Sequence, residues 1–560
     1  MFLDVRRCYD TVVLQTWQLR LNYEFLGKVI SGPFTIPSGI VATAVPIIQR
    51  LFDTTPQVGV MTTKSIGPLP RAGNREPIMT QYAPGCYMNA VGLTNPGVEA
   101  AVAQLSELEV PSDRFLLTSI FGGSVDEIVD VARRLAPVSD GLELNLSCPH
   151  AKGYGMDMGQ DADLVREITA AVKAVVDVPV VPKLTPNVPN IGEIAQAAVA
   201  GGADALCAIN TVGPAYFTAH GSPVLQNKVG GMSGRGILPV ALKCIHEIRA
   251  AVDVPIIGCG GVTTISDVYA FQDAGASIIG LGSSLTGMNS KEVSETFSVL
   301  QSALETKRAA CVLPEPPVDM DFRPYTLTAV ERVCTDIAIL KFDRDLDVKA
   351  GEFVYTWIPE IGEKPFSALT DKPFSLVVID VGEFTSQLLA LEAGTTIYVR
   401  GPHGNRVEPP EDARIVAVAG GTGLAAVYQI ARDFGDAHVF LGARSAERLY
   451  FKEECAAVAS THVATDDGSE GYHGVVTELL REWLLAQPEA ERARMVFYNC
   501  GPAPMVHAAV AVQQQFAMPE RIHSAIDYLT KCGVGICGAC TAPDGRRLCV
   551  DGPFLAETDE

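Results

Sequence analysis

Eight short apolar runs alternate with helical patterns between about residues 20 and 305. The runs are 34–39, 58–65, 115–120, 141–147, 178–184, 205–211, 254–261 and 277–283. Strands buried on both faces of a parallel sheet have such nearly continuous apolar sequences, and stretches such as 162–176 between them have helical spacing. Eight strands joined by helical crossovers predict a (β/α)₈ TIM barrel. An open doubly wound sheet is the alternative, but polar or glycine residues end nearly every run, which favours the closed barrel.

The pattern changes after a proline-rich segment that contains Pro314, Pro316 and Pro317. Prolines interrupt helical spacing, so they predict that a first domain over 1–308 ends in a linker over 309–322. Strand-like alternation with Gly and Pro turns then predicts a small antiparallel β-barrel. Strand–helix alternation returns after it, and a cysteine-rich segment closes the chain. The sequence therefore predicts an α/β protein whose last three domains cover 323–408, 409–518 and 519–560.

Charge and hydropathy narrow the class of protein. The 560 residues carry 43 basic and 65 acidic side chains, a net charge of −22, which argues against a nucleic-acid or anionic-membrane surface. The sequence has no run of 18 apolar residues that would predict a membrane span. The N-terminus has Asp4 and two arginines where a signal peptide needs an apolar run. We therefore expect a cytoplasmic protein.

Four of the fourteen cysteines crowd into the last thirty residues with the spacing C-x4-C-x2-C-x8-C. They are Cys532, Cys537, Cys540 and Cys549. The first three positions match the plant-type [2Fe–2S] spacing, and thiolates are suitable ligands for iron. Structural zinc is the alternative, but zinc sites favour paired C-x2-C elements and only one such pair occurs. The spacing therefore predicts a [2Fe–2S] cluster as the metal site.

A glycine-rich loop follows the apolar strand IVAVA and precedes a helical pattern. Its residues 421–426 fit the G-x-G-x-x-A form, in which glycines let a pyrophosphate approach a helix N-terminus. Further along, CGPAPM follows another strand, where a nicotinamide ring could lie, although an ordinary buried cysteine would look the same. The residues predicted to bind NAD are Gly420, Gly421, Gly423, Cys500 and Gly501.

Five motifs between about 325 and 555 occur in a characteristic order. They are EKPFS (363–367), VGEFT (381–385), GGTG (420–423), CGPAPM (500–505) and the cysteine cluster. In this order they resemble the electron-transfer subunit of NAD-linked dihydroorotate dehydrogenase, a member of the ferredoxin-reductase superfamily. The resemblance implies FAD bound around Lys364, Pro365, Phe366, Ser367 and Thr385, and NAD rather than NADP at the glycine loop. Lys364 stands where that family commonly has arginine.

Polar residues gather at the predicted C-terminal ends of the barrel strands, where the chemistry of such barrels takes place. The fourth strand leads into NLSCPH, which carries Cys148. From the sequence pattern alone this cysteine could be inert, a nucleophile or a general base, because reactivity requires partial exposure and a lowered pKa. Glycines and serines at the ends of the seventh and eighth strands could hold a phosphate.

Nine motifs within about 20–305 occur in order. They are PSG (37–39), TKS (63–65), NAVGL (89–93), NLSCP (145–149), PKL (182–184), NT (210–211), GGMSG (230–234), CGG (259–261) and GS (282–283). Together they resemble the catalytic subunit of class 1 dihydroorotate dehydrogenases, and the whole chain looks like a fusion of the two subunits of the NAD-linked class 1B enzymes.

The resemblance implies a role for each matching position, with Cys148 as the catalytic base. The implied substrate contacts, including the NAVGL backbone for a carboxylate, are Lys64, Asn89, Ala90, Val91, Gly92, Leu93, Asn145, His150, Asn210 and Thr211. The implied FMN contacts are Ser38, Lys64, Ser65, Ser119, Asn145, Lys183, Gly234, Gly260, Gly261, Gly282 and Ser283.

Two positions depart from the family pattern. His150 stands where the usual motif has asparagine, and SCPH is what uracil-reducing dihydropyrimidine dehydrogenases carry. The NAVGL segment nevertheless fits a carboxylated ring. Ser119 stands where the NAD-linked family usually has an asparagine that contacts flavin. The Gly-rich segment 151–159 could be a mobile lid over Cys148 or a rigid surface loop.

The resemblance implies that the protein oxidises (S)-dihydroorotate to orotate in de novo pyrimidine (UMP) biosynthesis. Cys148 would remove the C5 proton, FMN would accept the hydride from C6, and electrons would pass through the [2Fe–2S] cluster and FAD to NAD⁺. The family also suggests homodimers that form through the barrel. The alternatives are an NAD(P)H-dependent uracil or thymine reductase, a pure electron-transfer protein and a non-redox phosphate-binding barrel.

Overall fold

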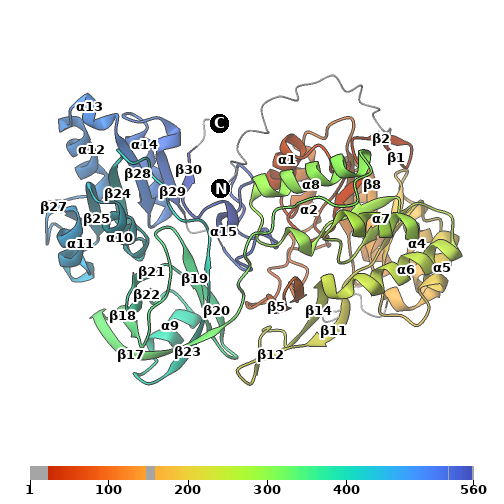
Figure 1. Cartoon of the computed structure of the whole chain (residues 1–560), viewed down its shortest axis with the longest axis horizontal. Helices are drawn as coiled ribbons and strands as arrows, with labels where there is room; N and C mark the ends of the chain where they lie inside the picture. Colours follow the sequence, from red (N-terminus) through yellow and green to blue (C-terminus); the bar gives the residue numbers. More distant parts are fainter. Residues whose placement is uncertain (1–22, 147–157, 527–528, 558–560) are drawn as a thin grey trace, which may run out of the picture.

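The computed structural model describes residues 23–146, 158–526 and 529–557. Figure 1 shows two halves, the N-terminal residues in red to yellow-green and the later domains in green to blue, with α15 (Leu548–Asp551) between them. Among the described helices, none combines the length and apolar character needed to cross a bilayer.

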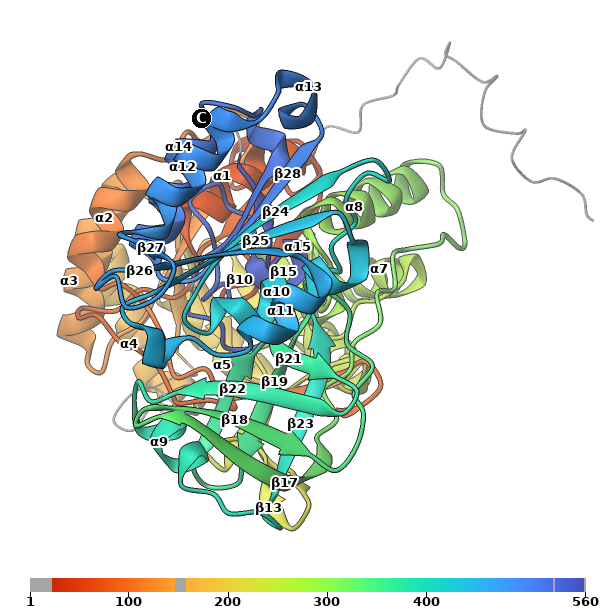
Figure 2. The same ribbon diagram turned by 90° about the vertical axis from the view of Figure 1, so that its left-hand side faces the viewer.

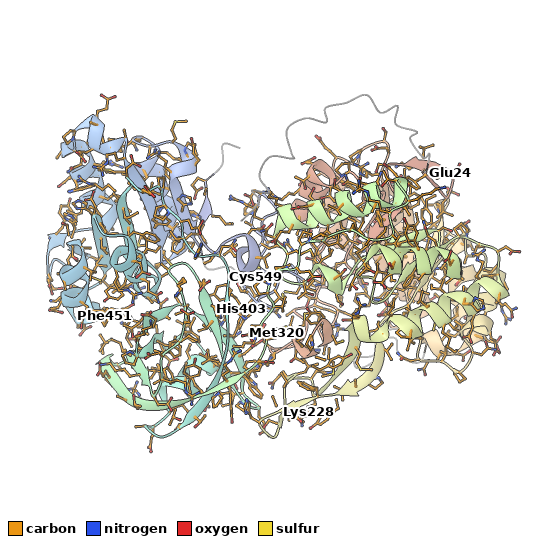
Figure 3. All side chains as sticks on the ribbon, viewed as in Figure 1. Glu24, Lys228, Met320, His403, Phe451 and Cys549 are labelled. Carbon is orange, nitrogen blue, oxygen red and sulfur yellow. The ribbon has the colours of Figure 1, made fainter. Side chains whose placement is uncertain are left out.

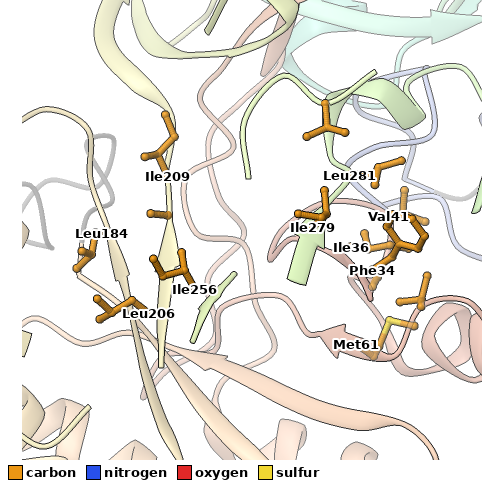
Figure 4. Close-up of a cluster of buried hydrophobic side chains, with 14 of the residues drawn as sticks. Phe34, Ile36, Val41, Met61, Leu184, Leu206, Ile209, Ile256, Ile279 and Leu281 are labelled. Carbon is orange, nitrogen blue, oxygen red and sulfur yellow. The ribbon is translucent and has the colours of Figure 1, made fainter. Parts of the chain in front are cut away.

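The N-terminal half is a closed barrel of eight parallel strands, as the sequence predicts. In barrel order the strands are β3 (Phe34–Ile36), β4 (Val60–Thr62), β7 (Phe115–Ile120), β8 (Gly141–Asn145), β9 (Val180–Leu184), β10 (Leu206–Ala208), β15 (Ile256–Cys259) and β16 (Ile278–Gly280). Every one of them lies within a predicted apolar run. Phe34, Ile36 and Leu206 belong to the buried apolar cluster drawn in Figure 4.

Eight helices accompany these strands. They are α1 (Val45–Thr54), α2 (Val98–Ser106), α3 (Val125–Leu135), α4 (Ala162–Lys173), α5 (Ile191–Ala200), α6 (Leu238–Ala251), α7 (Ile265–Ala274) and α8 (Ser290–Glu305). Local sequence explains several of their starting points. Thr264 and Asn289 form capping boxes with Asp267 and Glu292, which satisfy the free backbone N–H groups at a helix start.

Some barrel elements have no counterpart among the predicted strands. A hairpin of β1 (Tyr23–Phe25) and β2 (Lys28–Ile30) packs Phe25 against Phe115, with ring centroids 5.2 Å apart. A second, four-stranded sheet has the order β11 (Val212–Tyr216), β14 (Val229–Gly234), β6 (Cys86–Asn89) and β5 (Met79–Ala83). Two further strands of two residues each, β12 (Thr218–Ala219) and β13 (Ser222–Pro223), pair with each other between β11 and β14 in the chain.

After an irregular segment over 306–322, seven strands form an antiparallel sheet. In sheet order they are β20 (Gly362–Phe366), β19 (Phe353–Ile358), β23 (Thr396–His403), β17 (Arg323–Cys334), β18 (Ile337–Phe342), β22 (Phe374–Ile379) and β21 (Ala368–Asp371). Only Ser367 separates β20 from β21 in the chain, so a covalent connection joins the two edges of the predicted small barrel. Helix α9 (Glu383–Leu389) follows β22.

The predicted Rossmann-like domain is a second seven-stranded sheet. Its order is β27 (Tyr472–His473), β26 (Ser460–Thr465), β25 (Ala437–Ala443), β24 (Arg414–Gly420), β28 (Met495–Cys500), β29 (Ile522–Ala525) and β30 (Leu555–Ala556). The helices of this domain are α10 (Gly423–Phe434), α11 (Lys452–Val458), α12 (Val476–Ala486), α13 (Glu489–Arg492) and α14 (Ala503–Gln513). Figure 2 shows this sheet with α10 and α12 on opposite faces.

This sheet runs past the predicted domain boundary at 518. Strand β29 pairs in parallel with β28, and β30, from the last described residues, pairs with β29 in antiparallel register. The cysteine-rich segment therefore leaves the sheet after Ala525 and returns to it at Leu555. The sequence could not show this, because both strands are short and belong to segments without regular periodicity.

Candidate active site

A cavity opens at the C-terminal ends of the barrel strands, as expected for this fold. Its empty space, including the open mouth, is about 1310 Å³. The polar and glycine residues on its wall come from all parts of the barrel sequence. They are Ser38, Gly39, Lys64, Ser65, Asn89, Gly92, Asn145, Lys183, Asn210, Thr211, Ser233, Gly234, Gly260, Gly261, Gly282 and Ser283.

The structure thus brings together nearly all the predicted FMN and substrate positions. Ten of the eleven predicted FMN positions line the cavity, and Ser119 does not. Among the substrate positions, Val91 and Leu93 also lie on its wall, while Ala90 is buried behind it. Cys148 and His150 lie outside the described residues, as do Ser147 and most of the predicted lid segment.

A chain of hydrogen bonds organises the polar wall. The Ser65 hydroxyl lies 3.1 Å from Ser38 Oγ and 2.9 Å from Ser119 Oγ, and it accepts a 2.9 Å bond from Asn145 Nδ2. Asn210 Nδ2 donates to Asn145 Oδ1 at 3.4 Å. Such a network holds the amide groups of two strands in one orientation toward the cavity.

Ser119 belongs to the layer beneath the cavity. It is fully buried, and its hydroxyl donates to Glu143 Oε1 at 2.8 Å. The family pattern implies a direct flavin contact at this position, whereas in the structure Ser119 reaches the cavity only through its hydrogen bond with Ser65. A serine is shorter than the asparagine of the family pattern, so its hydroxyl remains below the wall.

Two lysines line the cavity, the buried Lys183 and the half-buried Lys64. Lys183 Nζ lies 3.8 Å from Glu143 Oε1, and although burial disfavours the charged lysine, the Glu143 carboxylate raises the pKa of Lys183. The pKa of Lys64 is lowered by its desolvation, an effect that negative charge on Cys537 partly offsets. A cationic Lys183 is suited to a reduced, anionic flavin ring.

The glycines at one end of the cavity form a cradle for a phosphate. Gly234, Gly260 and Gly261 have φ of +84°, +129° and +82°, a region that side chains rarely adopt. A Cβ on Gly260 would lie 2.7 Å from the Ala241 side chain. Nearby, Ser283 Oγ donates to Ser233 Oγ at 2.8 Å. These close approaches and the adjacent hydroxyls fit the phosphate group of FMN.

The cysteine-rich segment packs directly onto this cavity. Cys532, Ile536 and Cys537 lie on its wall. Two backbone bonds hold the segment there, from Val41 N–H to the Ile536 carbonyl at 2.8 Å and from Gly287 N–H to the Val534 carbonyl at 2.9 Å. Cys549 is labelled between the two halves in Figure 3. The barrel site and the cysteine cluster therefore form one continuous site.

The four thiols are buried and converge in pairs. Cys540 Sγ lies 3.4 Å from Cys549 Sγ, and Gly535 N–H donates to Cys549 Sγ at 3.2 Å. Hydrogen bonds from the Cys537 and Cys549 thiols lower the pKa of Cys532. No three His, Cys, Asp or Glu side chains in the described part of the chain are arranged to hold a single metal ion. Two neighbouring thiol pairs fit a two-iron cluster better than zinc.

The predicted NAD loops lie side by side. Strand β24 pairs with β28 so that Ala419 is opposite Cys500. Gly423 opens α10 so close to the second loop that a Cβ there would lie 2.0 Å from the Cys500 carbonyl oxygen. Gly421 and Gly501 both have positive φ, +55° and +154°. The start of α10 carries no side-chain cap, which suits a helix N-terminus that receives a pyrophosphate.

The predicted FAD positions lie on β20 and α9. Lys364 extends from β20 to the barrel, where its Nζ pairs with Glu76 Oε2 at 3.1 Å. Thr385 Oγ1 accepts bonds from the backbone N–H groups of Val381 and Gly382, both at 3.0 Å, at the start of α9. Lys364 therefore contributes a contact between domains that its sequence motif does not indicate.

Sequence reasoning missed three charged residues of this region. Glu143 had a signal, because it is an acidic residue within an otherwise apolar buried strand. Glu76 and Lys531 had no signal in the sequence, because each lies in a loop without a recognisable pattern. Their side chains form a 3.2 Å ion pair although they lie 455 positions apart in the chain.

Three family models match the chain. The model described as Dihydroorotate dehydrogenase matches residues 20–304, which is just over half of the chain. The model described as Oxidoreductase NAD-binding domain matches 417–511. The Iron-sulfur cluster binding domain of dihydroorotate dehydrogenase B matches 529–558.

Curated relatives agree with these models. The chain is 42% identical over 266 residues to the Dihydroorotate dehydrogenase B (NAD(+)), catalytic subunit, of Pyrococcus horikoshii, covering 47% of this chain and 86% of that protein. The protein of the same name from Methanosarcina mazei is 42% identical over 267 residues, covering 47% and 84%. A solved NADH-dependent reduced ferredoxin–NADP oxidoreductase covers 41% of this chain and 87% of its own at 27% identity, but its TM-score of 0.38 supports no argument. By the family model and these relatives, this chain belongs to the dihydroorotate dehydrogenase family.

Proposed function

We propose that this protein oxidises (S)-dihydroorotate to orotate and delivers the electrons to NAD⁺ within one polypeptide. The observation that carries the proposal is the position of Cys532 and Cys537 on the wall of the same cavity that holds the predicted FMN and substrate residues. When bound, FMN, the [2Fe–2S] cluster and FAD supply a hydride acceptor and a path for single electrons to NAD⁺.

The residues of the barrel have distinct roles in this proposal. Cys148, as a thiolate, removes the C5 proton next to the ring carbonyl. The amides of Asn145 and Asn210 bind the pyrimidine ring, and the backbone of 89–93 receives its carboxylate. The charge on Lys183 stabilises negative charge that develops on the flavin side of the cavity. The glycine cradle holds the FMN phosphate.

We also propose the domain assignment. It comprises an FMN-binding barrel over 1–308, an FAD-binding domain over 323–408, an NAD-binding domain from 409 that includes β29, and a [2Fe–2S] domain between β29 and β30. The pairing of β29 with β28 supports the shift of the third boundary from 518 to 525. A homodimer through the barrel and a cytoplasmic location stay predictions, which size-exclusion with light scattering and cell fractionation would test.

Anaerobic titration of the purified protein tests the function. We expect dihydroorotate to bleach the flavin absorbance and to produce the iron–sulfur EPR signal, and added NAD⁺ to reverse both with formation of NADH. Dihydrouracil, which lacks the carboxylate, is the matched control and is expected to reduce the protein much more slowly. Faster reduction by dihydrouracil than by dihydroorotate would contradict the proposal and favour a uracil-type enzyme.

A further inference from the structure

Lys531, the residue before the first cysteine of the cluster, inserts its side chain into the barrel domain. The side chain is only 9% exposed. Its ammonium donates to the carbonyl oxygens of Ala72 at 3.2 Å and Asn74 at 3.3 Å, and it pairs with Glu76 Oε1 at 3.2 Å. An ammonium has three N–H donors, so one barrel loop, 72–76, satisfies all three.

The loop that receives Lys531 is bonded to the segment 89–95, which contains the predicted carboxylate-binding backbone. Asn74 N–H donates to the Val91 carbonyl at 2.9 Å, and Asn74 Nδ2 donates to the Ala90 carbonyl at 2.9 Å. Arg71 and Asn95 exchange backbone bonds of 2.9 Å and 3.1 Å. The two segments are therefore hydrogen-bonded at two points, Asn74 to Ala90 and Val91, and Arg71 to Asn95.

Close packing prevents the two loops from moving independently. A Cβ on Gly73 would lie 2.5 Å from the Val91 carbonyl oxygen, and a Cβ on Gly92 would lie 2.7 Å from Asn74 N. Val91, Gly92 and Leu93 line the cavity on the other side of this contact. A displacement of loop 72–76 must therefore displace the cavity wall.

We propose that Lys531 is a positioning residue through which the iron–sulfur domain holds segment 89–93 in the conformation that binds the substrate carboxylate. The inference rests on the proposed function, because it takes a carboxylated pyrimidine as the ligand. It adds a second role to the iron–sulfur domain. In the proposed function this domain removes electrons from the barrel, and through Lys531 it also sets the affinity of the barrel for its substrate. The path has three links, from Lys531 to loop 72–76, from Asn74 to Ala90 and Val91, and from Val91 to the cavity.

Another contact of the same loop provides a matched control. Arg75 also joins the barrel to a later domain, through an ion pair with Glu383 at 3.1 Å, but both side chains are more than half exposed. An exposed pair of this kind contributes little. Arg75 has no described bond to segment 89–95.

The experiment measures orotate binding to the fully loaded protein by the change in flavin absorbance. We expect Lys531→Met to raise the Kd for orotate about tenfold, within the range by which residues between coupled sites change affinity. Arg75→Ala is expected to change it less than about twofold. In single-turnover reduction, Lys531→Met should raise the half-saturating dihydroorotate concentration and leave the limiting rate within about twofold of wild type.

Flavin content and the EPR signal of the reduced cluster verify that Lys531→Met keeps its cofactors. If that variant loses the cluster, Lys531→Gln replaces it. Its neutral amide retains two N–H donors, and we expect it to weaken orotate binding about threefold. Wild-type affinity in the cofactor-loaded Lys531 variant, or an equal loss in Arg75→Ala, would overturn the inference. A wild-type protein that does not bind orotate would instead contradict the proposed function.

Discussion

The carboxylate of Glu143 lies 3.8 Å from the ammonium of Lys183 within the barrel, and the two side chains are 1% and 7% exposed. Ser119 and Lys183 approach the same carboxylate oxygen, Glu143 Oε1. The pair joins neighbouring strands, β8 and β9, and its Lys183 lies on the cavity wall. Because a lone cation would be costly to bury there, Glu143 is the residue that keeps Lys183 charged.

Replacing Glu143 with glutamine should make flavin reduction sensitive to alkaline pH. Burial still disfavours the charged lysine in this variant, while the carboxylate that raises the pKa of Lys183 is gone. The pKa of Lys183 therefore falls in the variant, and the rate of flavin reduction declines as the pH rises through that pKa. The decline is about tenfold if the transition state loses about 1.4 kcal/mol of stabilisation. Stopped-flow reduction by dihydroorotate between pH 6 and 10 measures this. Ser119→Ala, which keeps both charges, is the control, and an equal decline in both variants would contradict the assignment.

Substitution of Gly423 by alanine should impair the reduction of NAD⁺ without impairing the oxidation of dihydroorotate at the barrel. The added Cβ would lie 2.0 Å from the Cys500 carbonyl oxygen, which belongs to the backbone and cannot rotate away. The two predicted NAD loops must therefore separate, at a cost of about 1–3 kcal/mol for overpacking. We expect NAD⁺ reduction to fall at least about tenfold, while dihydroorotate bleaches the barrel flavin at the wild-type rate. Stopped-flow absorbance separates the two steps, and unchanged NAD⁺ reduction would refute the prediction.

His403 should make the stability of the domain built on the antiparallel sheet depend on pH. Its Nε2 lies 3.0 Å from Arg400 Nη1, and burial followed by the Arg400 charge holds its pKa well below 6.5. In acid the unfolded chain protonates this histidine from about pH 6.5 downward while the folded chain does not. Stability is therefore lost as pH falls below 6.5, by up to about 1.4 kcal/mol per pH unit.

The measurement for His403 is the urea midpoint of the unfolding transition of this domain in the full-length protein at pH 7 and pH 5. His403→Gln removes the titrating group and keeps an oxygen that can accept from Arg400. We expect a smaller loss of stability between the two pH values in this variant than in wild type. Equal losses would show that other groups determine the acid sensitivity.

Cys148→Ser should disable proton removal at the barrel. A general base contributes roughly 10²–10⁴-fold to such a step, so we expect dihydroorotate to reduce the flavin at least about 100-fold more slowly. Orotate binding and flavin reduction by NADH use other residues and should remain. Rapid mixing of the variant with dihydroorotate, and separately with NADH, measures the two reduction rates. Reduction by dihydroorotate at the wild-type rate would show that Cys148 is not the base.

Much of the fold could be predicted from the sequence because its determinants are local. Each barrel strand is a nearly continuous apolar run, and polar or glycine residues at its end mark the side where the cavity forms. The same holds for the cysteine spacing and for the glycine loop before α10. Glu143 was missed although it has a local signal, because it is an acidic residue within an apolar strand. Its partner, Lys183, lies on the next barrel strand, and the sequence does not show that the two side chains meet.

The sequence by itself therefore determined the sequential order of the domains, the eight barrel strands and most of the polar residues that the barrel contributes to the cavity. Only the tertiary structure decided that Ser119 lies beneath the cavity, that β29 and β30 extend the second sheet, and that Lys531 enters the barrel. The reason is physical. The pattern of a strand is encoded within a few neighbouring residues. The acceptors of the Lys531 ammonium, by contrast, lie in loop 72–76, and they meet the lysine only when these distant segments pack together.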